Sequence, residues 1–145
     1  MITCTFENGN TAHLRHVVVD VLIVKDRQVL LIKRAKDLTE GGKWALPGGF
    51  MDRDETLEQT AEREAFEETG YRIKNLKFFK FRDDPKRPGD DRQTVPFFYS
   101  CEPGEQEGSH DHEVLEIKWF AFDALPPEAQ IAFDHGGIIR EYARV

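Results

Sequence analysis

The sequence has few cysteines and no long apolar run, and both absences narrow the class of protein. Only Cys4 and Cys101 occur among 145 residues. That is too few for a disulfide framework, so we expect reduced thiols in a cytoplasmic protein. The N-terminus carries neither a basic segment nor a long apolar stretch, and no later segment is apolar enough to cross a membrane. We therefore expect neither a signal peptide nor a membrane anchor.

Positive charge is also scarce in this chain. Lys and Arg number 20 against 27 Asp and Glu, which gives a formal net charge of −7. Nucleic-acid coating requires a basic surface, so we expect no nucleic-acid partner. An acidic protein can still bind phosphate groups where a metal ion or a local basic cluster screens their charge. The length and the 39% hydrophobic content predict a single globular domain spanning residues 1–145.

Runs of β-branched and aromatic residues predict five strands, the first two of which form a hairpin. Their ranges are 17–24, 29–33, 71–81, 94–101 and 114–122. Segment 36–49 contains four glycines and a proline, so we expect loop or irregular strand there. Segments 82–92 and 102–111 are rich in charge and turn residues and are expected to be solvated loops.

Two helices complete the predicted layout. Thr56 is a suitable N-cap for the first helix, in which Leu57, Ala61 and Ala65 recur at helical spacing and form the buried side. Asp134 can cap a second helix that ends the chain. The order of elements predicts an α+β fold of the α/β/α sandwich type, with a mixed sheet packed between helices.

The first helix carries three carboxylates on the side away from its buried face. Because an α-helix turns about 100° per residue, Glu67 and Glu68 fall roughly 60° and 40° to either side of Glu64. Like charges at this spacing cost about 0.2–0.5 kcal/mol per pair. Two of them also precede Gly70, the expected C-cap, where the helix dipole disfavours anions. Carboxylates are the usual ligands of hard divalent cations, so this arrangement predicts a metal site.

The residues around this cluster form a recognisable pattern. It reads Gly49, five residues, Glu55, seven residues, and then Arg-Glu-Ala-Phe-Glu-Glu-Thr-Gly at 63–70 with Tyr71 after it. At every fixed position the pattern resembles the signature box of the Nudix hydrolases, in which an aliphatic residue is usual where Tyr71 stands. Segment 43–49 and the early hydrophobic hairpin are similar to the same family.

The resemblance implies a Nudix-like fold and hydrolysis of the pyrophosphate bond of a nucleoside diphosphate linked to another group, X. Attack by water builds negative charge on phosphoryl oxygens, which a metal ion neutralises. The implied cofactor is Mg²⁺ or Mn²⁺. The implied ligands are Gly49, through its carbonyl, and Glu64, Glu67 and Glu68. Glu55 and Arg63 would orient the loop against the helix.

The sequence leaves the general base open. Glu64 in the box and Glu113 on a later polar loop are candidates, with Glu116 behind them. Glu116 alternates with apolar neighbours, so we expect it to face solvent or the opposite side of the sheet. His110 and His112 have no partners at a zinc spacing and are expected to lie on a solvated loop.

Substrate contacts are predicted outside the box. Lys33 and Arg34 end the second strand and are candidates for contacting substrate phosphates. Candidates for stacking on the base are Phe50, Phe97, Tyr99 and Phe133.

The expected substrate follows from looser similarities. Segments 82–92 and 132–139 are similar to the Nudix subgroup that hydrolyses ADP-ribose, which implies cleavage of ADP-ribose to AMP and ribose 5-phosphate. Two alternatives stay open: a pyrophosphohydrolase of (oxidised) nucleoside triphosphates, and a module that senses ADP-ribose or a similar nucleotide without cleaving it. Family members are often dimers, so a homodimer is a further expectation.

Overall fold

A mixed seven-stranded sheet is the framework of the fold in the computed structural model, which describes residues 1–145. Its strands are β3 (Val17–Lys25), β4 (Gln28–Arg34), β5 (Trp44–Ala45), β6 (Gly48–Phe50), β7 (Tyr71–Phe81), β8 (Val95–Gln106) and β9 (Val114–Ala121). Strand β3 is central: it pairs in parallel with β8 and antiparallel with β4 and β6. Strand β7 extends the sheet beyond β8, while β5 and β9 both pair with β4.

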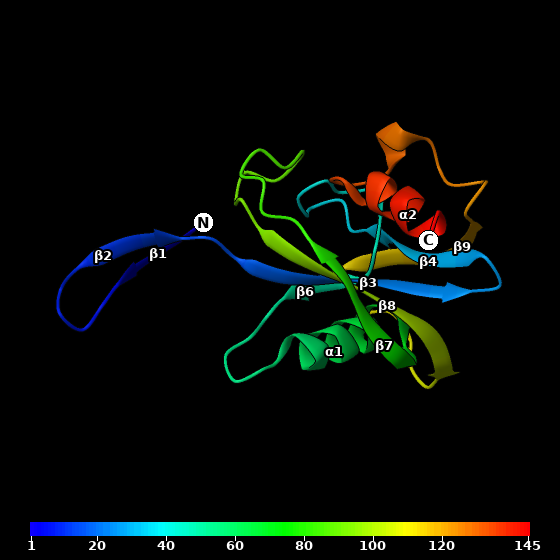
Figure 1. The fold of residues 1–145 in the computed structure, drawn as a ribbon, viewed down its shortest axis with the longest axis horizontal. Coiled ribbons are helices and arrows are strands. Elements are labelled where there is room, and N and C mark those ends of the chain that lie inside the picture. Colours follow the sequence, from blue (N-terminus) through cyan, green and yellow to red (C-terminus); the bar gives the residue numbers. More distant parts are fainter.

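One helix covers each face of this sheet (Figure 1). Helix α1 (Leu57–Thr69) lies on one side and α2 (His135–Ala143) on the other, and a short 3₁₀ helix, η1 (Glu128–Gln130), precedes α2. The α+β sandwich predicted from the sequence is therefore confirmed. Neither helix has the length and apolar character that a membrane crossing requires.

The two faces of β3 belong to two different apolar clusters, because successive side chains of a strand point to opposite sides. Val19, Val21 and Ile23 pack with Ala61 and Ala65 of α1. On the other face, the cluster below α2 includes Leu22, Phe98, Ile138 and Ile139. The predicted buried side of the first helix is thus present.

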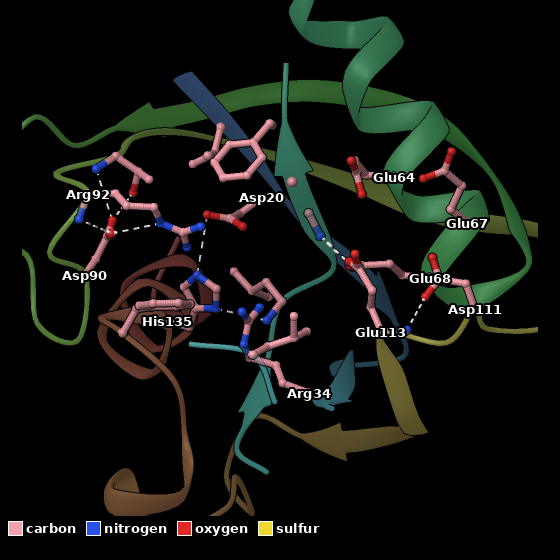
Figure 2. Close-up of a pocket in the computed structure, with 18 of the residues that line it drawn as sticks. Asp20, Arg34, Glu64, Glu67, Glu68, Asp90, Arg92, Asp111, Glu113 and His135 are labelled. Carbon is pink, nitrogen blue, oxygen red and sulfur yellow. Dashed lines mark hydrogen bonds and ion pairs between the residues drawn. The ribbon is translucent and has the colours of Figure 1, made fainter. Parts of the chain in front are cut away.

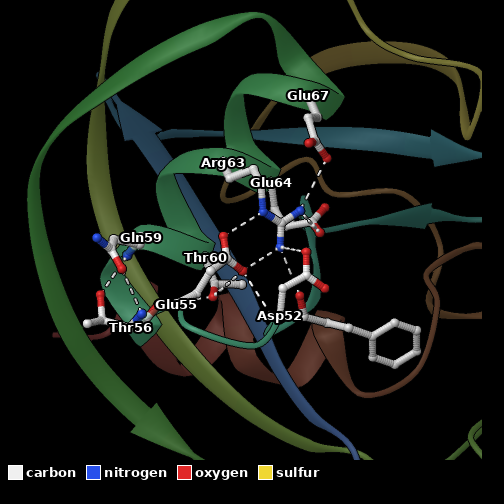
Figure 3. Close-up of polar contacts among 9 residues, drawn as sticks. Asp52, Glu55, Thr56, Gln59, Thr60, Arg63, Glu64 and Glu67 are labelled. Atoms are coloured by element: carbon white, nitrogen blue, oxygen red, sulfur yellow. Dashed lines mark hydrogen bonds and ion pairs between the residues drawn. The ribbon is translucent and has the colours of Figure 1, made fainter.

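Both ends of α1 form as the sequence predicts, and Figure 3 shows the N-terminal end. The Thr56 side chain accepts a hydrogen bond from the backbone N–H of Gln59, and the Gln59 side chain accepts one from the backbone N–H of Thr56. This reciprocal pair satisfies two donors that the first turn leaves without helical partners. Gly70 ends the helix with φ 78°, a left-handed conformation that L side chains rarely adopt.

A hairpin at the N-terminus was not predicted. Strands β1 (Ile2–Thr5) and β2 (Thr11–Leu14) form a separate two-stranded sheet that projects away from the main sheet (Figure 1). Most of its residues are exposed, so the segment lacks the alternation of apolar and polar residues that marks a half-buried strand. Two backbone oxygens of the loop 82–94 hold the base of this hairpin, because Arg92 accepts from the N-terminal amine and Gln93 accepts from Arg15.

One predicted boundary needs correction. Strand β8 continues to Gln106, so the loop expected at 102–111 begins only after that residue. Segment 36–49 contains the short strand β5 and the start of β6, in agreement with the loop or irregular strand expected there. Asp134 stands at the N-cap position of α2, but its side chain makes no capping hydrogen bond, because its carboxylate pairs with Arg87.

Candidate active site

A cavity of about 530 Å³ lies beside the C-terminal half of α1 (Figure 2). Its walls come from α1, the strands β3, β4 and β6, the start of α2, and the loops 82–94 and 107–113. One end is acidic and holds Glu64, Glu67 and Glu68 together with Asp111 and Glu113. The other end holds side chains of both charges, among them Asp20, Arg87, Asp90 and His135.

Arg63 joins α1 to the loop that precedes it (Figure 3). Its Nε and Nη2 donate to the two carboxylate oxygens of Glu55 at 2.7 and 2.8 Å, and Nη2 also donates to the Phe50 carbonyl at 3.0 Å. Such a forked contact fixes direction as well as distance. The hydrogen bonds from Arg63 lower the pKa of Glu55 to about 2. The pairing of Arg63 with Glu55 that the sequence led us to expect is therefore present.

The three glutamates of the box differ in exposure. Glu67 is exposed, Glu64 is half-buried, and Glu68 is only 3% exposed. The expectation that all three lie on a face pointing away from the protein interior is therefore wrong for Glu68. Its Oε2 accepts a hydrogen bond from the backbone N–H of Gly48 at 2.9 Å, which pins it against β6.

Burial changes the ionisation of two of these carboxyl groups. Burial, with repulsion from Glu67 and Glu113, raises the pKa of Glu64 to about 7 against the opposing effect of Arg63. Burial, with repulsion from Glu64 and Asp111, raises the pKa of Glu68 well above its usual value. Negative charge is therefore costly here until a cation compensates it.

Gly49 lies against this acidic cluster. A Cβ at position 49 would meet the carboxylate of Glu64, which would have to shift. A Cβ at position 48 would meet the backbone oxygen of Val19, so glycine at 48 allows the close pairing of β6 with β3.

The acidic end suits a hard divalent cation by its donor chemistry. Carboxylate oxygens surround it, and the charge they carry is poorly compensated by the protein. In this conformation no three of them converge on one point. Arg63 Nη1 holds Glu64 at 2.8 Å and Glu67 at 3.3 Å, while Gly48 holds Glu68. One oxygen each of Glu64 and Glu67 therefore faces Arg63 in this conformation, while Arg63 also keeps its contacts with Glu55.

Among the candidate bases outside the box, the structure brings only Glu113 to the cavity. Its backbone N–H donates to Asp111 Oδ1 at 3.0 Å, which orders the loop at this edge. Glu116 lies on β9 opposite Lys33 and does not line the cavity. His112 lines the cavity beside Glu113, whereas His110 does not.

Of the two basic residues at the end of β4, Arg34 lines the cavity and Lys33 does not. Arg34 lines the cavity between its two ends and donates from Nε to the Thr39 carbonyl at 2.8 Å, which orients the guanidinium (Figure 2). Lys33 does not line the cavity, and its ammonium lies 5.7 Å from the centre of the Trp44 ring. Of the two basic residues, Arg34 is the one placed to contact a bound substrate.

Two of the four candidate aromatic rings line the cavity. Phe97 and Tyr99 instead belong to the cluster on the α1 side of the sheet. Phe133 lines the cavity, but the guanidinium carbons of Arg34 and Arg87 lie 5.2 and 4.8 Å from its centre. The guanidinium carbon of Arg92 also lies 5.1 Å from the centre of the Phe50 ring, but Phe50 is 41% exposed, which leaves it the more accessible ring for a base.

The sequence did not reveal the cluster at the other end of the cavity. Arg87 is 7% exposed and donates to Asp134 Oδ1 at 3.0 Å and to Thr94 Oγ1 at 2.8 Å. Asp90 is buried beside it. The expectation of a solvated loop at 82–92 is therefore wrong for these two residues. A signal did exist for Asp20, the only charged residue within the apolar run 17–24.

Comparison with known proteins gives a consistent result. Residues 14–142 match the family model described as the NUDIX domain. The chain is 37% identical over 129 residues to the ADP-ribose pyrophosphatase of Methanocaldococcus jannaschii, which covers 88% of this chain and 73% of that protein. It is also 32% identical over 136 residues to the NAD-capped RNA hydrolase NudC of Haemophilus influenzae, but spans only 50% of that protein and 90% of its own length.

A solved structure agrees with these relatives. The bifunctional NMN adenylyltransferase/ADP ribose pyrophosphatase of Francisella tularensis, in complex with AMP and a Mn ion, superposes with a TM-score of 0.71 at 27% identity. The match covers 92% of this chain and 42% of that protein.

Proposed function

This chain belongs to the Nudix family of pyrophosphohydrolases, and we propose that its substrate is ADP-ribose, which it cleaves to AMP and ribose 5-phosphate. The observation that carries the proposal is the composition of the cavity: the box glutamates occupy one end, Arg34 lies in the middle, and polar side chains occupy the other end. A diphosphate that joins two sugars fits this order. The 37% identity to an ADP-ribose pyrophosphatase supports the same choice.

In the proposed site the metal ligands are Glu64, Glu67, Glu68 and the carbonyl of Gly49, and the cation is Mg²⁺ or Mn²⁺. A bound divalent cation supplies charge neutralisation at the phosphoryl oxygens and lowers the pKa of water. Arg63 and Glu55 hold the loop after β6 in position. Arg34 binds a phosphate oxygen of the substrate and sets the diphosphate against the acidic end.

Proton transfer from the attacking water requires a base at the same end. Glu64 and Glu113 both line the cavity and compete for this role. Exposed Glu113 stands on the loop 107–113 and can approach a bound diphosphate. Phe50, at the mouth of the cavity, is the proposed stacking partner of the adenine.

Two rival functions lead to different products. Hydrolysis of (oxidised) nucleoside triphosphates would release a nucleoside monophosphate and pyrophosphate. A sensor of ADP-ribose would bind the nucleotide and release nothing, but binding alone does not require an intact set of acidic residues. The relationship to NudC adds NAD(H) as a compound to test, although the net charge of −7 disfavours a long RNA.

A product screen separates these functions. Purified protein is incubated with Mg²⁺ or Mn²⁺ and, separately, ADP-ribose, NADH, nucleotide sugars and nucleoside triphosphates, and the products are resolved by HPLC. We expect AMP and ribose 5-phosphate from ADP-ribose at the highest kcat/KM. Preferred cleavage of a triphosphate, or binding of ADP-ribose without any product, would contradict the proposal.

Family members are often dimers, and we propose a homodimer for this chain. Size-exclusion chromatography of the same preparation tests it.

A further inference from the structure

Asp20 is a carboxylate in an apolar setting. It lies in the middle of β3, on the strand face that also presents Val18 and Leu22, and it is only 7% exposed. Burying a carboxylate is unfavourable unless charged or hydrogen-bonding partners compensate the lost hydration. Asp20 nevertheless lines the cavity, so the groups around its carboxylate indicate its role.

Arg87 and His135 lie close to the Asp20 carboxylate but do not form hydrogen bonds of normal length with it. Arg87 Nη2 lies 3.6 Å and His135 Nε2 lies 3.4 Å from Oδ2 of Asp20. Both distances exceed the usual 2.7–3.2 Å of an N–H···O hydrogen bond. Oδ2 is buried and has no hydrogen-bond partner within the protein. Asp20 lines the cavity, and its other oxygen, Oδ1, also makes no hydrogen bond within the protein and is not enclosed in the same way, so Oδ1 is the acceptor available to a bound molecule (Figure 2).

The two neighbouring donors are held in place by other contacts. Arg87 is fixed by Asp134 and Thr94. His135 Nδ1 accepts a hydrogen bond from the backbone N–H of Leu46 at 3.0 Å, and its Nε2 lies 3.1 Å from Arg87 Nη2 as well as facing Asp20. Moving either residue toward Asp20 would break these bonds. Burial raises the pKa of Asp20, but His135, Arg87 and Arg34 outweigh it and keep the pKa below its usual value.

The surroundings determine which chemical group can supply the missing donor. The missing partner of Asp20 has to be a hydrogen-bond donor, which an ionised phosphate is not, although Arg87 and Arg92 also line this end of the cavity. Stacking of a base on Phe133 is also disfavoured, because the guanidiniums of Arg34 and Arg87 already lie close to that ring. Phe133 itself has φ 53°, an uncommon conformation for a bulky residue, and it leads into the segment that carries His135. Hydroxyl groups, which donate and accept, match this polar lining.

We propose that Asp20 accepts a hydrogen bond from a hydroxyl of the sugar in X, with Arg87 and His135 as the residues that position its carboxylate. The proposal rests on the proposed function in that it assumes a nucleoside diphosphate substrate. It goes further by assigning the end of the cavity opposite the box glutamates to the sugar that leaves with the second phosphate, and by making Asp20 a specificity-determining residue.

The test compares ADP-ribose with the methyl ester of ADP, which has the same diphosphate but no hydroxyl on X. We expect the wild-type protein to favour ADP-ribose about 10- to 100-fold in kcat/KM, the range for a hydrogen bond to a charged group. Asp20→Asn should lower kcat/KM for ADP-ribose by a similar factor, mainly through KM, and should change that for the methyl ester less than about 3-fold.

Asp134→Asn is the matched control. It removes a charged partner of Arg87, as Asp20→Asn does, but Asp134 does not line the cavity. The amide oxygen of asparagine can still accept from Arg87, and Thr94 also holds that side chain, so Asp20 keeps its positioning residues. The effect on the two substrates should therefore be equal, so that the ratio of their kcat/KM values stays at the wild-type value. Thermal melting of each variant shows whether a loss of activity reflects unfolding.

Equal losses for both substrates in Asp20→Asn would overturn the proposal, as would a wild-type protein that does not distinguish them. An ADP-ribose analogue that lacks the 2′ and 3′ hydroxyls of the adenosine ribose tests whether Asp20 contacts that sugar instead. If Asp20→Asn no longer lowers kcat/KM for this analogue alone, Asp20 contacts the adenosine ribose and the proposal is overturned. If Asp20→Asn does not fold, wild-type kinetics with deoxy analogues of the terminal ribose decide the question. A penalty of about 10-fold or more for one of them supports the subsite, and no penalty for any overturns it.

Failure of the proposed function gives a different result. If the wild-type protein hydrolyses neither compound, calorimetry with the α,β-methylene analogues of ADP-ribose and of ADP methyl ester measures binding directly. Weaker binding of the ADP-ribose analogue alone in Asp20→Asn keeps the subsite while the hydrolase proposal falls. Equal binding of both analogues by both proteins overturns the subsite.

Discussion

Replacing Glu64 by glutamine should stabilise the metal-free protein at pH 8 while removing its activity. In the folded chain the pKa of Glu64 rises from its ordinary 4.5 to about 7, chiefly through burial. Between these two values the folded state holds a proton that the unfolded state has released. Stability of the metal-free wild-type protein therefore falls as the pH rises through this window, and it levels off above pH 7.

The size of the effect follows from the same pKa values. A rise from 4.5 to about 7 corresponds to an upper bound of about 3 kcal/mol against the ionised form. This cost already includes the favourable ion pair with Arg63, so glutamine should recover most of it, and we expect a net gain of about 2 kcal/mol at pH 8. For a chain of 145 residues this gain is a rise in Tm of about 6 °C. At pH 5, where Glu64 is already protonated, the gain should vanish.

The assay is thermal unfolding followed by circular dichroism in EDTA at pH 5 and pH 8. Glu62→Gln, an exposed position on the same helix, is the control and should shift Tm equally at both pH values. With Mg²⁺ added, the wild-type protein should gain stability at pH 8 and Glu64→Gln should gain much less. The reasoning is wrong if the difference in Tm between variant and wild type is the same at both pH values, or if the variant keeps near-normal turnover.

Three further predictions concern the same end of the cavity. Glu67→Gln and Glu68→Gln should each reduce Mg²⁺-dependent turnover at least about 100-fold, because each removes a proposed metal ligand; near-normal rates in steady-state assays would refute the ligand assignment. Glu113→Gln should lose the acidic limb of the pH–rate profile if Glu113 is the base, whereas an unchanged profile would assign the role elsewhere. Arg63→Lys should lower stability in urea by about 1–2 kcal/mol and also reduce kcat, because lysine cannot replace the forked contact with Glu55; unchanged kcat would show that this contact does not position the site.

The sequence predicted the parts of the fold whose signals are local. The cap at Thr56 and the glycine at 70 define α1 within a few residues, and the three glutamates lie inside that segment. Helical spacing alone then gathers the carboxylates on one side. The hairpin of β3 and β4 was predictable for the same reason, because its strands are joined by a two-residue turn at Asp26 and Arg27, both with positive φ.

The polar end of the cavity was not predictable because its contacts are distant in the chain. Arg87 lies in a segment that reads as a solvated loop, yet its main partner, Asp134, is 47 positions further on. Asp90 lies nearby in the same loop, but the other two carboxylates around Arg87 come from distant parts of the chain, Asp20 from β3 and Asp134 from the start of α2. The burial of Glu68 was not predicted for a similar reason, since its contact with Gly48 depends on the approach of β6, which lies 20 positions earlier in the chain.

The parallel pairing of β3 with β8 has a consequence for the order in which the protein folds. Val19 lies beside Phe97, so this pairing closes a long segment of chain, and that segment contains α1 and β6. Closing a long loop costs conformational entropy before its contacts compensate it, which makes such pairings slow relative to local hairpins and helices. Helix α1 can form early, but the other walls of the cavity beside it form only when β3 pairs with β8. A nascent or partly folded chain therefore carries the box glutamates without a pocket to hold a nucleotide, and nucleotide binding reports completion of the fold.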